Sequence, residues 1–565
     1  MAATSFDDII LKLGEFGKYQ RRMLLLVFCM SLPVSMHAFV QVFLAAYTDH
    51  WCAPPPELQR SNCSDWTLPT GTTCDEAKKE LYIPKTKSAY EQCSRYNISY
   101  LADIEVPEVN NQSEIISCDN GWVFDHSEYE STIVQSFYLV CDDKKLPNYA
   151  QSIFFVGTLF GSIVMGILSD RIGRKPTLFM GIAVQVVFGV ATAFSPNFWS
   201  YAFFRFFVAA ANSGIYLTAF VIGAEFVGPS RRTASGVFIA VVFALGFMIL
   251  ALLAFLIRNW QILQIVITLP VLVAFLFIRV VPESARWLIS HQKFDEAEKI
   301  IRNISRVNGV ELSADIFNQE TRKQFLDEHA KVKQKNASVL DLFRRPNTRN
   351  ITININFIWF VNMLVYVGLS ITTASLGWNN YLAFFFSGLV EIPADLICLY
   401  IMERWGRRTP LSCFMVLGGL ACLLNTFMPK GAARTTVGMI GKFAITASYT
   451  LVYIYTAELY ATPVRAMGMG LATTTARISA ILTPLVLLLS DSWPPLPLLI
   501  FGASSLMGGL ATLFLPETVG RHLPETLEEA EIMAKGRGLM FWKGKDSYSK
   551  AGTDNVDNGA KPRAI

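Results

Sequence analysis

Four ionisable side chains lie within long apolar segments of this 565-residue chain: Arg477, Lys442, Glu391 and Asp395. An ionisable group near the middle of a bilayer costs about 2.5–3.5 kcal/mol on insertion scales, so each of them is a candidate for function. A guanidinium cannot be neutralised, and it can hold a carboxylate through two parallel hydrogen bonds. We therefore expect Arg477 to bind the carboxylate of a solute. The alternative is a structural ion pair with an acid on another helix.

Glu391 and Asp395 are four residues apart, which places both on one face of a helix, with Pro393 between them. Two acids at this spacing repel each other unless a cation or a proton lies there. They are thus predicted to receive a cationic group. Alternatively, one of them pairs with Arg477 or with Lys442.

Tyrosines share helical faces with polar residues in two apolar segments. The spacing of Lys442, Thr446, Tyr449 and Tyr453 puts all four on one face of a helix. Tyr366 lies in an earlier segment, close to polar residues. Aromatic walls suit flat or cationic organic solutes through stacking and cation–π contact. We predict that these tyrosines line a binding cavity; the alternative for each is packing against a helix or lipid.

The composition indicates where these segments reside. Hydrophobic residues make up 52% of the chain and charged residues 17%, with a mean hydropathy of +0.36. Since a soluble domain carries roughly 25% charged residues, the composition argues against a soluble enzyme, a disordered chain or a fibre. The net charge of +4 is too small to indicate nucleic acid. The chain is predicted to be a polytopic membrane protein in contact with the lipid bilayer.

Twelve apolar runs are long enough to cross a bilayer, which takes about 20 residues per helix. Because the runs are continuous rather than alternating, they favour helices over barrel strands, and the expected fold class is an all-α membrane protein with twelve transmembrane helices. Arg205 in the fourth run and His37 in the first are further candidate site residues, and either can be structural. The runs lie near 23–47, 147–168, 177–194, 198–223, 235–256, 259–281, 354–375, 379–402, 409–428, 435–457, 469–490 and 495–515.

Basic residues in short loops predict the orientation. With twelve spans, clusters such as Arg21-Arg22 and Arg231-Arg232 all fall on one side of the membrane. The positive-inside rule makes that side the cytosol, so both termini are expected there. The predicted organisation is a cytosolic N-terminus, an N-terminal six-helix half that includes an extracellular loop at 48–146, a cytosolic linker, a C-terminal six-helix half and a cytosolic tail, at 1–22, 23–281, 282–353, 354–515 and 516–565.

The long loop between the first two runs has the features of an exterior segment. It holds an even number of cysteines, which predicts three disulfides, although six cysteines permit 15 pairings. These cysteines are Cys52, Cys63, Cys74, Cys93, Cys118 and Cys141. Its three sequons are candidate glycosylation sites, at Asn62, Asn97 and Asn111.

Short charged strings recur at a constant offset. Asp170 to Arg174 (DRIGR) returns 233 residues later as Glu403 to Arg407 (ERWGR). Glu225 and the arginine seven residues after it return at the same offset, and Pro-Glu-Ser at 282–284 returns as Pro-Glu-Thr at 516–518. The chain therefore reads as two parallel six-helix halves with a site between them at mid-membrane, as in rocker-type secondary transporters.

The repeated charges are predicted to act in gating. Arginines and acids at helix ends can pair with one another and stabilise one facing state by a few kcal/mol at most, a useful size for a switch. The alternative is that the arginines only set the topology. The predicted gating set is Asp170, Arg171, Arg174, Glu225, Arg232, Glu403, Arg404, Arg407, Glu458 and Arg465.

Several of these strings resemble known family signatures. GILSDRIGRK at 166–175 resembles a loop signature of the major facilitator superfamily. PESARWL at 282–288, YTAELY at 455–460, LPET at 515–518 and the cysteine-bearing loop resemble solute carrier family 22, the organic cation, anion and carnitine transporters. The resemblance extends from about residue 14 to 530. The seventh, tenth and eleventh helices are most similar to organic anion (nicotinate/urate-type) and carnitine-type members.

The resemblance implies a plasma-membrane secondary transporter of organic anions or carboxylate-bearing zwitterions. At the position of Arg477, anion and carnitine transporters of this family typically have arginine and cation transporters have aspartate. Glu391 matches the glutamate of cation, carnitine and nicotinate/urate-type members, whereas Asp395 stands where many anion transporters have a basic residue. Lys442, Tyr449 and Tyr366 match residues that line the cavity in organic anion relatives.

Two other functions remain open at this stage. An organic cation transporter would use Glu391 and Asp395, with Arg477 held in an ion pair. A solute-sensing receptor would bind without transport. The sequence contains no phosphate loop, no zinc-spaced His or Cys pairs and no nucleophile elbow, so neither an enzyme nor a cofactor is expected, and a coupling ion is left unassigned.

Overall fold

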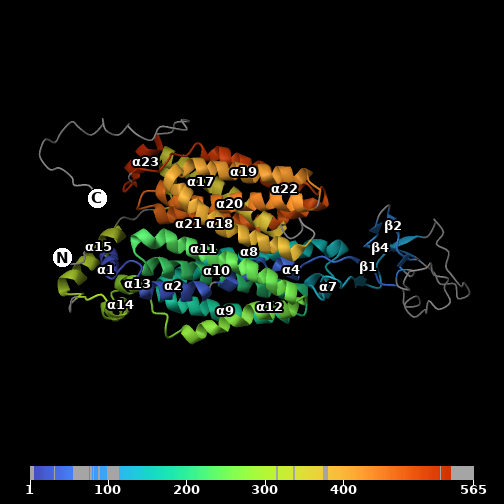
Figure 1. The fold of residues 1–565 in the computed structure, drawn as a ribbon, viewed down its shortest axis with the longest axis horizontal. Coiled ribbons are helices and arrows are strands. Elements are labelled where there is room, and N and C mark those ends of the chain that lie inside the picture. The colour runs from blue at the N-terminus through green and yellow to red at the C-terminus, as the bar shows by residue number, and fades with distance from the viewer. Residues whose placement is uncertain are drawn as a thin grey trace, which may run out of the picture.

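The computed structural model describes most of the chain. The described residues are 6–30, 32–54, 76, 79, 80, 82–86, 89–97, 114–312, 316–334, 338–372, 379–429, 431–521 and 523–535. Long helices run side by side along the longest axis of the molecule, and short strands gather at one end of it (Figure 1).

The N-terminal half contains six membrane-length segments. The first is a broken helix over Lys18–Leu44, formed by α2 (Lys18–Met30), α3 (Leu32–Phe39) and α4 (Gln41–Leu44). The sixth is α12 (Trp260–Thr268), which continues as a 3₁₀ helix over Leu269–Phe277. The other four are α8 (Leu146–Ile172), α9 (Arg174–Ala193), α10 (Phe198–Phe226) and α11 (Arg232–Leu256).

The C-terminal half repeats this arrangement. Its helices are α17 (Pro346–Thr372), α18 (Asn380–Trp405), α19 (Arg408–Phe427), α20 (Ala432–Leu459), α21 (Arg465–Leu487) and α22 (Leu496–Thr512). Eleven segments among the described residues are long and apolar enough to cross a membrane, and the 17-residue α22 is the twelfth apolar helix. The predicted all-α fold with twelve spans is confirmed, and each helix coincides with a predicted run.

Polar residues between the apolar runs begin several helices. Asn197, Asn259 and Asn379 stand directly before α10, α12 and α18, and each side-chain oxygen accepts a hydrogen bond from a backbone N–H of the first turn. An asparagine at this position satisfies a donor that the helix itself leaves unpaired. The short polar breaks of the sequence therefore define where the spans start.

Small residues allow the helices of one half to approach closely. In α8, a Cβ added to Gly157 would lie 2.3 Å from the carbonyl oxygen of Phe206, and one added to Gly161 would lie 2.2 Å from that of Ala210. Any larger side chain would push α10 away. Glycines four residues apart are a common solution for membrane helices, which pack without a hydrophobic driving force between them.

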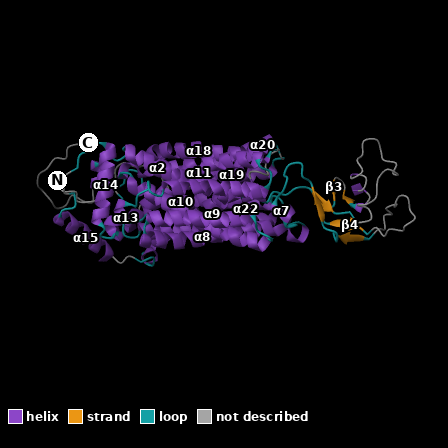
Figure 2. Ribbon diagram, turned by 90° about the horizontal axis from the view of Figure 1, so that it is seen from below, coloured by secondary structure: helices purple, strands orange, loops and turns teal. Residues whose placement is uncertain are grey.

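The loop that follows the first span forms a small strand-containing unit at one end of the bundle, which we call the loop end (Figure 2). Three antiparallel pairs build it: β1 (His50–Cys52) with β6 (Trp122–Phe124), β2 (Lys85–Thr86) with β3 (Ala89–Tyr90), and β4 (Ser94–Tyr96) with β5 (Ile115–Ser117). The short helix α7 (Ile133–Ser136) leads back to the bundle.

Two of the three predicted disulfides lie within the described residues, Cys52–Cys118 and Cys93–Cys141. They tie β1 to the segment after β5, and the segment before β4 to the start of the second span. Cys63 and Cys74 lie outside the described residues, as do the sequons at Asn62 and Asn111. Asn97 is exposed directly after β4, where a glycan would meet no obstruction from its own side chain's burial.

The opposite end of the bundle, which we call the terminal end, carries short helices from three parts of the chain (Figure 1). They are α1 (Phe6–Lys12) before the first span, α13 (Ala285–Ser290), α14 (Phe294–Asn308), α15 (Gln319–Gln334) and α16 (Asp341–Arg344) between the halves, and α23 (Leu527–Lys535) after the last span. With α1 and α23 at the same end, the chain crosses the bundle an even number of times.

Candidate functional site

A central cavity of about 220 Å³ lies between the two halves. Residues of α3, α8, α10 and α11 form one side of it, and residues of α17, α18, α20 and α21 form the other. Six of the seven residues predicted to bind the solute line this cavity: Tyr366, Glu391, Asp395, Tyr449, Tyr453 and Arg477. They come from four helices and are brought together only by the packing of the C-terminal half.

The seventh predicted residue, Lys442, is fully buried beside the cavity wall. Its Nζ lies 2.8 Å from Oε1 of Glu391, donates a hydrogen bond to Ser370 and lies 3.6 Å from the centre of the Tyr366 ring. The Tyr366 hydroxyl donates to the same Glu391 oxygen at 3.0 Å. The alternative in which one acid pairs with Lys442 is therefore what the structure has, and Glu391 already meets a cation of the protein.

Asp395 and Arg477 differ from that pair. Asp395 is 3% exposed, and its carboxylate accepts a hydrogen bond from Thr450. Within the part of the chain that the structure describes, neither Asp395 nor Arg477 forms an ion pair, although both line the cavity. A carboxylate and a guanidinium that are not neutralised by the protein thus share one space. Each favours an opposite charge on a molecule placed between them.

Aromatic rings form much of the wall near Arg477. Tyr366 stacks on Tyr449 with ring centres 5.7 Å apart, and Tyr449 meets Tyr453 edge to face at 5.6 Å. Trp359 packs behind them, 4.5 Å from Tyr453. Rings held in this way lose little freedom when a solute binds, and their faces attract cationic groups.

Sequence reasoning missed the wall contributed by the N-terminal half. Phe39, Phe154, Phe243 and Tyr216 line the cavity opposite the tyrosines. A phenylalanine in an apolar run gives no sign of whether it faces lipid, a neighbouring helix or a cavity. The one usable signal is Asn212, a polar residue four positions before Tyr216 in α10, which also lines the cavity.

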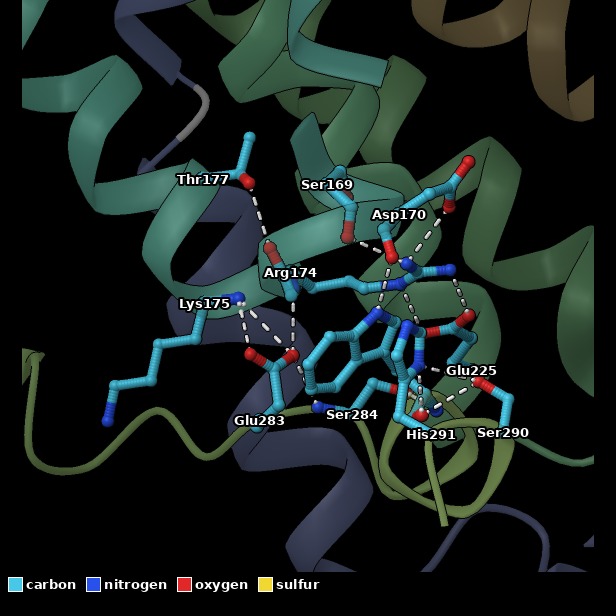
Figure 3. Close-up of polar contacts among 12 residues, drawn as sticks. Ser169, Asp170, Arg174, Lys175, Thr177, Glu225, Glu283, Ser284, Ser290 and His291 are labelled. Atoms are coloured by element: carbon cyan, nitrogen blue, oxygen red, sulfur yellow. Dashed lines mark hydrogen bonds and ion pairs between the residues drawn. The ribbon is translucent and has the colours of Figure 1, made fainter. Parts of the chain in front are cut away.

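The first copy of the repeated charges forms a compact network at the terminal end (Figure 3). Arg174 lies 3.2 Å from Glu225 and 3.0 Å from Asp170. The Glu283 carboxylate accepts hydrogen bonds from the backbone N–H groups at the start of α9, the first at 2.8 Å from Arg174. Gly173 has φ +109°, and a Cβ there would lie 2.3 Å from Glu283, so the turn requires glycine.

The second copy repeats this network in the other half. Arg407 lies 2.9 Å from Glu458, and Glu517 accepts from the backbone N–H groups of Arg407 and Arg408 at 2.9 and 3.0 Å. Gly406 again has a positive φ, +82°. Sequence reasoning found the repeated strings but did not assign Glu283 and Glu517 as helix-start acceptors. Their recurrence in Pro-Glu-Ser and Pro-Glu-Thr was the available signal.

The other predicted gating residues are more loosely held. Arg232 lies 2.6 Å from Asp7 of α1, and Arg465 donates to the carbonyl oxygen of Tyr460 at 3.3 Å. Arg171 and Arg404 are exposed, and the side chain of Glu403 lies outside the described residues. None of the printed pairs of this set joins one half to the other, so each stabilises its own half in this conformation.

Contacts between the halves gather near the loop end. Lys144 lies 3.0 Å from Asp491, and Asn380 donates to Glu128 at 3.2 Å. Phe43 of the first span stacks on Tyr381 of α18, with ring centres 5.5 Å apart. At the terminal end, the described residues include no ion pair between the halves. The cavity is therefore closed toward the loop end in this conformation.

Known structures share this architecture. A partially occluded inward-open form of the xylose transporter XylE from E. coli matches 89% of the chain and all of that protein, with 13% identity and a TM-score of 0.56. The human organic anion transporter MFSD10 matches 87% of the chain and 99% of that protein, with 14% identity and a TM-score of 0.51. At this level of identity the likeness concerns the fold, which is that of major facilitator transporters.

Sequence comparison is more specific. The family model described as "Sugar (and other) transporter" matches residues 115–530. An "Organic cation transporter protein" of Drosophila melanogaster is 40% identical over 94% of this chain and 95% of its own length. A "Beta-alanine transporter" of the same organism is 34% identical over 94% and 89%, and human "Solute carrier family 22 member 13" is 35% identical over 93% of both chains. The chain belongs to solute carrier family 22, so it is a multi-pass membrane transporter of small organic solutes and not an enzyme.

Proposed function

We propose that this secondary transporter moves small organic solutes that carry both a carboxylate and a cationic group. The observation that carries the proposal is that Asp395 and Arg477 line one cavity without an ion-pair partner among the described residues. A lone anion would leave the acid uncompensated, and a lone cation would leave the guanidinium uncompensated. A zwitterion neutralises both, and removing one partner of a buried pair is costly.

Each side chain has a distinct role in this proposal. Arg477 receives the carboxylate through its fork of donors, and Asp395 receives the cationic group. The stacked rings of Tyr366 and Tyr449 supply the wall between them and add cation–π attraction of roughly 0.5–2 kcal/mol. The Glu391–Lys442 pair keeps the Tyr366 ring in place and adds no net charge to the cavity.

The names of relatives span more than one substrate class. One relative is called a beta-alanine transporter, and β-alanine carries an ammonium and a carboxylate. Another is called an organic cation transporter, which favours the alternative in which acids alone hold a cation. That alternative requires Arg477 to be paired with an acid, and no described acid lies within ion-pair distance of it.

The transport cycle follows from the duplicated fold. We infer a plasma-membrane location with the loop end outside and the terminal end in the cytosol, as the positive-inside rule predicts. The conformation described above is then closed to the exterior. Opening it requires Lys144 to leave Asp491 and Tyr381 to leave Phe43, while the terminal end closes. A solute that binds both states exchanges sides when the halves rock about it.

A competition panel in proteoliposomes tests the proposal. Uptake of labelled carnitine is measured against unlabelled carnitine, β-alanine, nicotinate, urate and tetraethylammonium. We expect the zwitterions to compete at lower concentrations than either the pure anions or the cation. Stronger competition by tetraethylammonium would favour the cation transporter. Solute that binds the vesicles but never accumulates inside them would favour a receptor.

A further inference from the structure

A second arginine lies deep in the N-terminal half, away from the cavity surface. Arg205 of α10 is fully buried, and its Nη1 donates to the backbone oxygen of His37 at 3.0 Å. Its guanidinium carbon lies 4.4 Å from the centre of the Phe154 ring. Within the described residues no carboxylate lies at ion-pair distance. Arginine cannot shed its charge, and a ring face compensates that charge less well than a carboxylate does.

The free donors of Arg205 form one particular edge of the guanidinium. Nε and Nη2 are buried, and neither has a hydrogen-bond acceptor among the described residues. The same edge of Arg95 holds the two oxygens of Asp119 at 2.7 and 2.8 Å, and that of Arg174 holds Glu225 at 3.4 and 3.2 Å. This edge is shaped for a planar group with two oxygens.

His37 adds a further polar group at this corner between α3 and α10. Its ring is fully buried, and neither ring nitrogen has a partner among the described residues. A neutral imidazole carries one N–H donor. Buried polar atoms without partners are rare in folded proteins, so four of them on two adjoining residues call for an explanation.

The duplication sharpens the contrast with the other half. In α20 the buried Lys442 meets the carboxylate of Glu391 from α18. Applying the offset of 233 residues to Glu391 gives Thr158 of α8, whose hydroxyl donates to the backbone of its own helix at 3.2 Å. The C-terminal half therefore supplies a carboxylate for its buried cation, and the N-terminal half has a threonine at the equivalent position.

We propose that Arg205 and His37 form an anion site for a small planar carboxylate. The Nε and Nη2 donors hold its two oxygens, and the imidazole N–H of His37 donates to one of them. The site is separate from Arg477, and it does not depend on the proposed zwitterion substrate. The carboxylate is either a free small monocarboxylate or the carboxylate of the transported solute in another conformation.

Two routes to the site are each blocked by few side chains. Phe154, which covers the guanidinium, also lines the central cavity. On the other side, the hydroxyl of Tyr201, one turn before Arg205 in α10, donates to Gln41 at 2.5 Å. Gln41 lines a second cavity of about 300 Å³ that lies toward the loop end. A rotamer change of Phe154 or Gln41 is enough to give a small anion a path.

The test measures the thermal unfolding midpoint of the purified full-length protein while sodium formate replaces sodium chloride at constant ionic strength. We expect a saturable rise in the midpoint, as for any ligand that binds the folded state. Arg205→Lys keeps the charge but loses the fork, so formate should bind about ten- to a hundredfold more weakly. His37→Gln should weaken it in the same direction, and it keeps the test valid if changes at Arg205 prevent folding.

Arg477→Gln is the matched control, because it removes the guanidinium that faces the cavity. The formate response should persist in this variant. The proposal is wrong if the wild type shows no rise, or if the rise is lost in Arg477→Gln and kept in Arg205→Lys and His37→Gln. Uptake assays separate the two sources of carboxylate: competitive inhibition of carnitine uptake by formate indicates the solute's own carboxylate, and non-competitive inhibition indicates a free one.

Discussion

Replacing Lys442 by methionine removes a buried ammonium and leaves the Glu391 carboxylate without its cation. Nζ of Lys442 lies 2.8 Å from Glu391, and both side chains are almost completely buried. Breaking such a pair from one side costs about 3–5 kcal/mol, because the remaining charge stays desolvated. We expect Lys442→Met and Glu391→Gln each to lower the free energy of unfolding by about this amount.

The double variant should be far more stable than the sum of the two single effects predicts. With both charges gone, neither has to be buried alone, and the coupling energy should fall within the roughly 1.5–7 kcal/mol measured for close charge pairs. Denaturant unfolding in detergent micelles measures all four corners of this cycle. Lys144→Met is the control, since its exposed pair with Asp491 is worth about 0.2–1 kcal/mol. Additive single effects would refute the structural role of the buried pair.

Two further predictions concern the loop end. Asp491→Ala removes the exposed pair with Lys144, so the population open toward the loop end should rise up to about fivefold; the labelling rate of a cysteine placed at Ile371, which lines the second cavity, reports it, and an unchanged or slower rate would contradict the prediction. Hydrogen bonds from Arg95 hold the pKa of Asp119 below its ordinary value. The stabilisation from this pair is then complete above about pH 4 and is lost as pH falls through the lowered pKa. Protease resistance of the strand-containing unit should stay constant from pH 8 to pH 5, and a decline within that range would argue against it.

Much of the fold could be predicted because bilayer physics constrains sequence strongly. Apolar runs of helix length and the offset of 233 residues between DRIGR and ERWGR define twelve spans and two halves without any knowledge of packing. The disulfide partners could not be predicted, because spacing alone permits many pairings. Cys52 meets Cys118 only because β1 pairs with β6, immediately after which the chain has passed through Cys118.

The site was predicted only in part, for a different reason. A charge within an apolar run stands out, so Arg477, Asp395 and Glu391 were found from sequence. Which acid meets which cation depends on how three helices are rotated about their axes, and the sequence left that question open. The structure pairs Lys442 with Glu391. The phenylalanine wall of the N-terminal half carries no sequence signal that separates it from lipid-facing residues.

Uptake by Arg477→Ala is the most direct test of the central claim, that this guanidinium binds the carboxylate of a zwitterionic solute. Carnitine and its methyl ester are a matched pair of probes, because they differ in the charge of the carboxylate. With surface expression confirmed, Arg477→Ala should reduce carnitine uptake by about ten- to a hundredfold or abolish it, and should change uptake of the ester little. Undiminished carnitine uptake in this variant would contradict the account.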